Sequence, residues 1–147
     1  MQRRQINGSL GSLITIMHYR EFNLSFVGSG QTTSIVIANA IPISPYTFLG
    51  LSMRVHAVDI GSSGKFELVF YKVNPSPADG QDFVDTGTPL GTSDPVNSSS
   101  AAGDLVEFPS AITNPQTPFV RAVLKGTGPT SGNLYAVLSA DLTAKTG

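Results

Sequence analysis

The two histidines, His18 and His56, are the side chains best suited to acid–base chemistry or metal binding near neutral pH. Each lies in an alternating segment on the parity opposite the apolar residues, which indicates a half-exposed position on a strand. A metal site would need both rings and a carboxylate, and nothing in the spacing brings them together. The chain has no cysteine, so thiolate ligands are excluded as well. We therefore predict no metal site and no catalytic histidine.

Nucleophile and phosphate-binding patterns are also missing from the sequence. No Gly-x-Ser-x-Gly motif occurs, so nothing indicates a serine on a sharp turn beside a histidine and an aspartate. The glycine-rich segments 28–30 and 126–128 precede no helical pattern and carry no following lysine, which makes them turns rather than phosphate loops. We predict a protein that is not an enzyme and holds no cofactor.

Acidic side chains gather in a long polar segment, residues 74–103, which is typical of a functional or partner-contacting loop. Asp79, Asp82 and Asp85 lack the one-residue alternation and distal glutamate of a calcium-binding EF-hand. We interpret these three aspartates as partner contacts. Arg3 and Arg4, in an N-terminal stretch without periodicity, are the other predicted partner contacts.

Several aromatic residues leave a carbohydrate-binding face open as an alternative. Aromatic side chains on strands are more commonly core residues or cross-strand pairs, but a row of them can also stack against sugar rings. The residues that would form such a platform are Tyr46, Phe48, Tyr71, Phe83 and Tyr135.

Residues 49–73 are the element around which the rest of the chain is organised. Apolar residues alternate with polar ones along 49–57, residues 61–64 read Gly-Ser-Ser-Gly, and Phe66, Leu68 and Phe70 then share one parity. This pattern predicts a β-hairpin with one apolar face. Such a sheet must be covered by the rest of the chain.

Further short strands are predicted at 13–19, around 22–26, at 34–38, 105–108, 119–125 and 134–142, separated by turn signals. No window has sustained helical spacing. We predict an all-β fold, an antiparallel β-sandwich of jelly-roll type with about eight strands, formed by residues 13–147 after an N-terminal arm, residues 1–12. The expected core comprises Phe66, Leu68, Phe70, Val120, Ala122, Leu124, Leu134, Ala136 and Leu138.

Composition limits the partners. Charged residues make up 13% of the 147 residues, against about 25% in an average soluble chain, which suits a surface partly covered by neighbours. Residues 55–107 hold eight acidic side chains against two lysines, and no basic stripe indicates nucleic-acid binding. Residues 22–53 are uncharged but broken by glycines and prolines, so we predict no membrane span and, from the lack of a cleavage site, no signal peptide.

From residue 49 onward the chain resembles small β-sandwich proteins of tailed-phage virions, particularly head-decoration (cement) proteins. The segments that carry the resemblance are 51–55, 61–64, 66–71, 83–87, 118–123 and 132–137, and the strand Phe119-Val120-Arg121-Ala122 followed by a Gly/Ser/Thr-Pro turn and an alternating final strand comes nearest to a signature. The resemblance implies a virion protein that binds the outside of an icosahedral shell, in many cases as a symmetric oligomer, without enzymatic activity.

The functional prediction is therefore a capsid decoration protein. Its expected partners are the capsid protein and copies of itself, and its expected location is the virion surface after synthesis in the host cytoplasm. The alternatives are a jelly-roll coat protein that itself forms the shell, and a carbohydrate-binding module.

Overall fold

The computed structural model describes the backbone of residues 11–76, 81–85 and 88–146, and the side chains of 11–74 and 88–146. The regular structure in these ranges is entirely β, as predicted. None of the described residues forms a helix that is long and apolar enough to cross a membrane. The strands are β1 (Gly11–Asn23), β2 (Thr32–Pro42), β3 (Phe48–Ile60), β4 (Lys65–Ser76), β5 (Gln81–Asp85), β6 (Gly91–Thr92), β7 (Val96–Asn97), β8 (Leu105–Glu107), β9 (Ile112–Thr113), β10 (Phe119–Thr127) and β11 (Leu134–Lys145).

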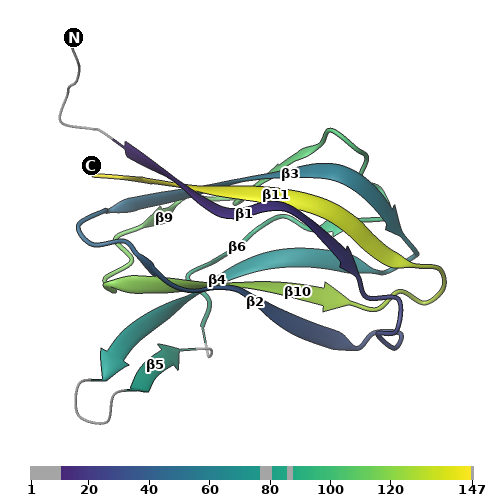
Figure 1. The fold of residues 1–147 in the computed structure, drawn as a ribbon, viewed down its shortest axis with the longest axis horizontal. Helices are drawn as coiled ribbons and strands as arrows, with labels where there is room; N and C mark the ends of the chain where they lie inside the picture. Colours follow the sequence, from purple (N-terminus) through teal and green to yellow (C-terminus); the bar gives the residue numbers. More distant parts are fainter. Residues whose placement is uncertain (1–10, 77–80, 86–87, 147) are drawn as a thin grey trace.

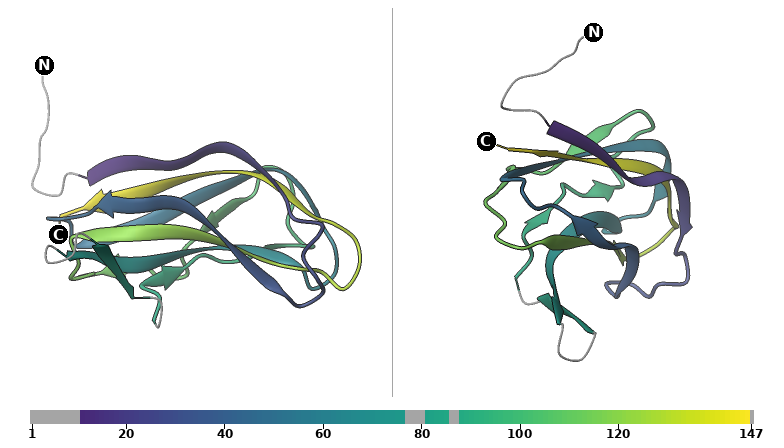
Figure 2. Two further views of the ribbon diagram at one scale, coloured as in Figure 1. Left: turned by 60° about the horizontal axis from the view of Figure 1, so that its bottom comes forward. Right: turned by 60° about the vertical axis from the view of Figure 1, so that its left-hand side comes forward.

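Two antiparallel sheets face each other (Figures 1 and 2). The first, here the β11 sheet, has the order β1-β11-β3-β8, with β9 also paired to β3. The second, the β10 sheet, has the order β2-β10-β4-β5, with β6 and β7 also paired to β4. Successive long strands alternate between the sheets, and among the described strands only β4 and β5 are consecutive neighbours in one sheet. Two four-stranded paths connected in this way form a jelly roll, which confirms the predicted fold class.

The predicted hairpin at residues 49–73 is wrong in its pairing. Both strands exist, and the turn between them is closed by the Gly64 N–H, which donates to the Gly61 carbonyl at 3.1 Å. However, β3 pairs with β11 and β4 pairs with β10, so the turn crosses from one sheet to the other. A glycine-rich turn after an alternating strand has the same local chemistry in both arrangements.

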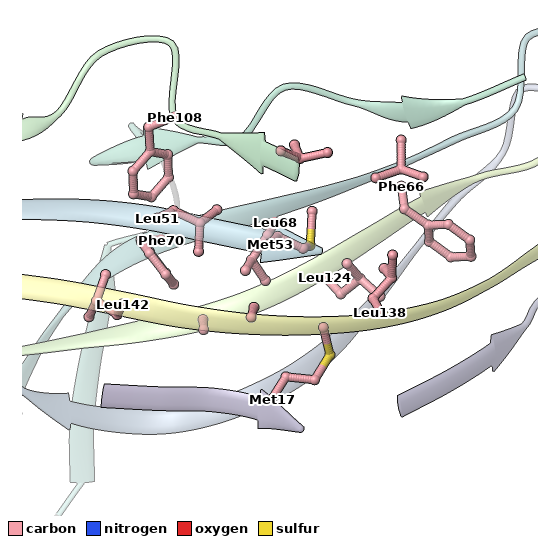
Figure 3. Packing of buried hydrophobic residues seen from close by; sticks show 14 of the residues in the cluster. Met17, Leu51, Met53, Phe66, Leu68, Phe70, Phe108, Leu124, Leu138 and Leu142 are labelled. Carbon is pink, nitrogen blue, oxygen red and sulfur yellow. The ribbon is translucent and has the colours of Figure 1, made fainter. Parts of the chain in front are cut away.

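The core lies between the sheets (Figure 3). Its apolar side chains come from alternate positions of β3, β4, β10 and β11, because side chains on a strand point to opposite faces in turn. All nine predicted core residues have no exposed surface. Phe22 and Phe66, from opposite sheets, lie with ring centroids 6.0 Å apart, and Phe70 meets Phe108 edge-on at 5.2 Å.

The predicted strand around residues 22–26 does not form. Phe22 is buried as part of β1, which continues to Asn23. Leu24 is buried beyond the end of the strand, and Phe26 is 81% exposed in the following turn. The start of β1 at Gly11 also lies inside the arm predicted for residues 1–12.

Candidate functional site

The predicted partner contacts lie mostly outside the described residues. The described residues do not include Arg3, Arg4 or Asp79. Asp82 and Asp85 lie on β5, at register positions opposite Pro75 and Lys72 of β4, and their side chains are not among those described. Their role as contacts stays a prediction.

Both histidines contact one tyrosine on the outer face of the β11 sheet. The Tyr19 ring stacks on His56 with centroids 4.4 Å apart, and His18 meets the Tyr19 ring edge-on at 4.8 Å. The Nε2 atom of His56 lies 2.8 Å from the Ser139 Oγ. The fold thus brings together two residues whose spacing gave no indication of proximity. Among the described residues, no three histidine or carboxylate side chains are grouped so that they could hold a metal ion.

Tyr19 was not anticipated from the sequence. The register of β1 with β11 shifts between Met17 and Arg20, so His18 and Tyr19 together face the single residue Ser139. Tyr19 has a φ of 43° and its side chain is 62% exposed. A bulge re-aims side chains and breaks the two-residue alternation on which parity arguments depend. The sequence therefore gives no signal for the position of Tyr19.

The five aromatic residues of the predicted sugar platform do not share a face, and that prediction is wrong. Tyr71 is buried on the outer side of the β10 sheet, whereas Tyr135 is on the outer side of the β11 sheet. Phe48 and Tyr46 line two separate grooves. Phe83 lies on β5, outside the described side chains.

Tyr135 has a carboxylate neighbour across the strand pair. Its hydroxyl donates to Glu21 Oε2 at 3.4 Å. Partial removal from water and, next, the Glu21 charge raise the pKa of Tyr135 above its ordinary value of 10.0. The Tyr135 side chain is therefore neutral at physiological pH.

The outer face of the β10 sheet carries a second apolar cluster, Val69, Tyr71 and Val123. These side chains point away from the main core, yet their exposures are only 3%, 4% and 7%. The register places Val69 opposite Val123 and Tyr71 opposite Arg121. Lys125, two residues beyond Val123, places its ammonium 5.4 Å from the centre of the Tyr71 ring. Lys125 and Tyr71 therefore close over the valine pair.

Two grooves lie at the end of the sandwich where β1 begins and β11 ends. The first, of about 530 Å³, is mostly apolar and includes Gly50, where a side chain would meet open space. The second, of about 470 Å³, lies between the β2–β3 and β9–β10 connections. It is lined by Ser44, Pro45, Tyr46, Thr47, Asn114, Pro115, Gln116, Thr117 and Pro118. Neither groove brings together a nucleophile, a base and a third polar group.

The sequence matches no protein family and no curated protein sequence. Its fold is similar to part of the chains in structures of infectious bursal disease virus. The VP2 subviral particle gives a TM-score of 0.56 at 16% identity, over 94% of this chain and 32% of that one. The virus of the Gx strain gives 0.56 at 13% identity, over 93% and 32%. This chain thus spans about a third of the length of these viral chains, and the likeness concerns the fold.

Proposed function

We propose that the chain is a structural protein of a virion, which binds the outer face of an icosahedral shell and stabilises it without enzymatic activity. The observation that supports this best is the similarity of almost the whole jelly roll to a third of the chains that form the infectious bursal disease virus particles. Fold similarity alone does not carry function, so the proposal depends equally on the surface.

The surface has the composition of a protein covered by neighbours. Only 13% of the residues in the whole chain are charged, and interface cores are depleted in charge. The edge strand β2 carries no charged residue over its eleven residues. Of the usual protections of an edge strand against pairing with another chain, β2 lacks charges and short length, and it has only a terminal proline and two register shifts against β10. A second copy or the shell protein is the partner we propose for these surfaces.

The predicted contact residues fit this role by their charges. Arg3 and Arg4 precede β1, and Asp79, Asp82 and Asp85 belong to the acidic segment around β5. We propose that the arginines of one copy meet acidic side chains of the shell or of a neighbouring copy. Charge-assisted hydrogen bonds of this kind, together with strand pairing, can offset the entropy lost when an arm becomes ordered.

A coat protein that forms the shell itself is the second candidate. It is favoured by the same comparison, because VP2 is named there as the protein of a subviral particle. The two candidates predict different behaviour in solution. A coat protein assembles into closed particles when purified, whereas a decoration protein stays a monomer or small oligomer and needs a shell.

Sedimentation tests the proposal. The purified chain is centrifuged alone and with empty shells from the same virus, which are removed by pelleting. We expect the chain to stay in the supernatant alone and to pellet with shells at a fixed ratio. Formation of particles by the chain alone would support the coat-protein alternative. A chain that does neither would contradict both candidates.

Deletion of residues 1–10 tests the arm and leaves β1 intact. We expect the melting temperature of the free protein to stay nearly unchanged, while the amount that pellets with shells falls sharply. Replacement of Arg3 and Arg4 by glutamine is the matched charge variant and should reproduce part of the loss. A lower melting temperature with unchanged binding per folded molecule would show that the arm packs on its own sandwich.

A further inference from the structure

The 470 Å³ groove between the β2–β3 and β9–β10 connections has an uncharged, polar lining. Besides prolines it is formed by Ser44, Tyr46, Thr47, Asn114, Gln116 and Thr117. These side chains offer hydroxyl and amide groups, which both donate and accept hydrogen bonds. With no acid or base in the lining, the groove suits a neutral ligand that has several hydroxyl groups.

Some of these polar groups are satisfied by the protein and others are not. The Tyr46 hydroxyl lies 2.6 Å from Ser12 Oγ, and Thr117 donates to the carbonyl oxygens of Val73 and Phe119. By contrast, the side-chain amides of Asn114 and Gln116 make no hydrogen bond within the described part of the chain. Both residues are exposed, so their amides are hydrated in the free protein and stay available to a ligand. Thr47 Oγ1 also lacks a partner, but it has almost no accessible surface, so a ligand in the groove does not reach it.

The backbone holds the two free amides in place at a cost. Asn114 and Gln116 have φ values of 46° and 53°, in the left-handed region where glycine meets no steric penalty. Residues with side chains persist in such conformations where the surrounding structure enforces them, and these positions cluster at ligand sites. Here glycine would fit the backbone better, but it would remove both amides from the groove.

Backbone hydrogen bonds fix the two walls relative to each other. The Asn114 N–H donates to the Thr47 carbonyl at 2.8 Å, and the Ile43 N–H donates to the Pro118 carbonyl at 3.0 Å. The Thr47 N–H donates to Lys145 at the end of β11, at 3.1 Å. The groove is therefore formed before any ligand arrives, which lowers the entropic cost of binding.

We propose that this groove binds a neutral carbohydrate. The sugar hydroxyls pair with the exposed amides of Asn114 and Gln116. The C–H face of a pyranose ring packs on the half-buried Tyr46 ring and on the neighbouring prolines. A proline-rich peptide fits less well, because such peptides bind grooves lined by several aromatic side chains and this one has a single tyrosine.

The test uses the full chain and needs no shell, so its outcome is separate from that of the proposed capsid role. An array of neutral glycans identifies the best binder, whose affinity is then measured by calorimetric titration. We expect Asn114→Gly and Gln116→Gly each to weaken binding about tenfold or more, since each removes an amide and keeps the left-handed backbone. Neither should lower the melting temperature.

The control is Tyr135→Phe, on the outer face of the β11 sheet, which should leave glycan affinity unchanged. The proposal is overturned if no glycan on the array binds, or if the Asn114→Gly/Gln116→Gly double variant binds the selected glycan as tightly as the parent chain. Binding of a polyproline peptide at these residues, with no response to glycans, would overturn it as well.

Discussion

The outer faces of the two sheets are completed in different ways. On the β11 sheet, the outward positions of β11 are mainly polar, and the exposed Tyr19 of β1 stacks on His56. On the β10 sheet, Val69, Tyr71 and Val123 point outward and are nevertheless buried. Their cover comes from the same sheet, through the contact of Lys125 with Tyr71. One face is solvated by its own residues, and the other is shielded by a long basic side chain.

The difference follows from two kinds of sequence pattern. In β11, buried residues alternate with half-buried or exposed ones almost without interruption, as expected for a strand with one face in the core. In β4 and β10 the apolar residues occupy both parities, as in Leu68, Val69, Phe70 and Tyr71. A strand of that kind needs cover on both faces. The stem of a lysine can provide it while the ammonium stays near water.

The largest loss of stability should come from substitutions in the core, where the two sheets contribute equally buried leucines. Leu68 of the β10 sheet and Leu138 of the β11 sheet both have no exposed surface. Replacing either by alanine should lower the free energy of unfolding by about 2–5 kcal/mol, because a cavity remains. Denaturant melts measure the loss. If one of the two variants lost less than about 1 kcal/mol of unfolding free energy, the two sheets would not contribute equally to the core.

The next largest loss of stability should come from the turn at residues 61–64, where the chain crosses from β3 in one sheet to β4 in the other. At Gly61, after β3, an added Cβ would collide with the backbone of Ser131 and Gly132, whereas at Gly50 it would meet open space. Gly61→Ala should therefore cost about 1–3 kcal/mol through steric strain. Gly50→Ala is the matched control and should be tolerated. Equal melting temperatures for the two variants would show that the crossing can shift without cost.

A smaller loss of stability should distinguish the outer face of the β10 sheet from that of the β11 sheet. Lys125→Ala removes the cover of the Val69–Val123 pair and should cost about 1 kcal/mol, while Lys125→Met keeps most of the stem and should recover part of it. Lys145→Ala, on the β11 sheet, should change the free energy of unfolding much less. If Lys125→Met were as unstable as Lys125→Ala, the charge rather than the stem would be responsible.

The smallest effect lies at high pH on the β11 sheet. The pKa of Tyr135 is raised in the folded state, so folding favours the neutral tyrosine. The stabilisation from this shift is complete below pH 10.0, the ordinary pKa, and is lost as the pH rises through the pKa of the folded state. Glu21→Gln should lower the Tyr135 pKa partway toward 10.0. Tyrosinate absorbance during a pH titration, compared with that of Tyr135→Phe, gives this shift. An unchanged pKa in Glu21→Gln would leave partial removal from water as the sole cause.

The sequence predicted what local alternation determines. The final strand was anticipated with its buried parity, from Leu134 to Leu142, because buried and outward residues alternate along its whole length. The jelly-roll class also followed from the number and spacing of short strands. The pairing of β3 with β11 could not be predicted, since it depends on residues more than seventy positions away.

The candidate sites were harder to predict than the fold. Tyr46 was singled out, but as part of an aromatic row and not as one wall of a polar groove. Asn114 and Gln116 lie in a turn-rich connection with no motif, and only the backbone geometry draws attention to them. Tyr19 depends on a bulge that strand periodicity cannot reveal. In each case the decisive information is a conformation, which composition and spacing do not encode.

The positions of β10 and β11 have a consequence for the order in which the fold forms. Each is the inner strand between two long neighbours, and both come from residues 119–145. Until that segment is available, β1 and β2 have no partner strand, and β3 has only the short strands β8 and β9. During synthesis, the edges of β1, β2 and β3 therefore stay largely unpaired until residues 119–145 are made, and unpaired strand edges favour aggregation. Refolding of the complete chain should be slow for its size, because its sheets close only through contacts distant in sequence.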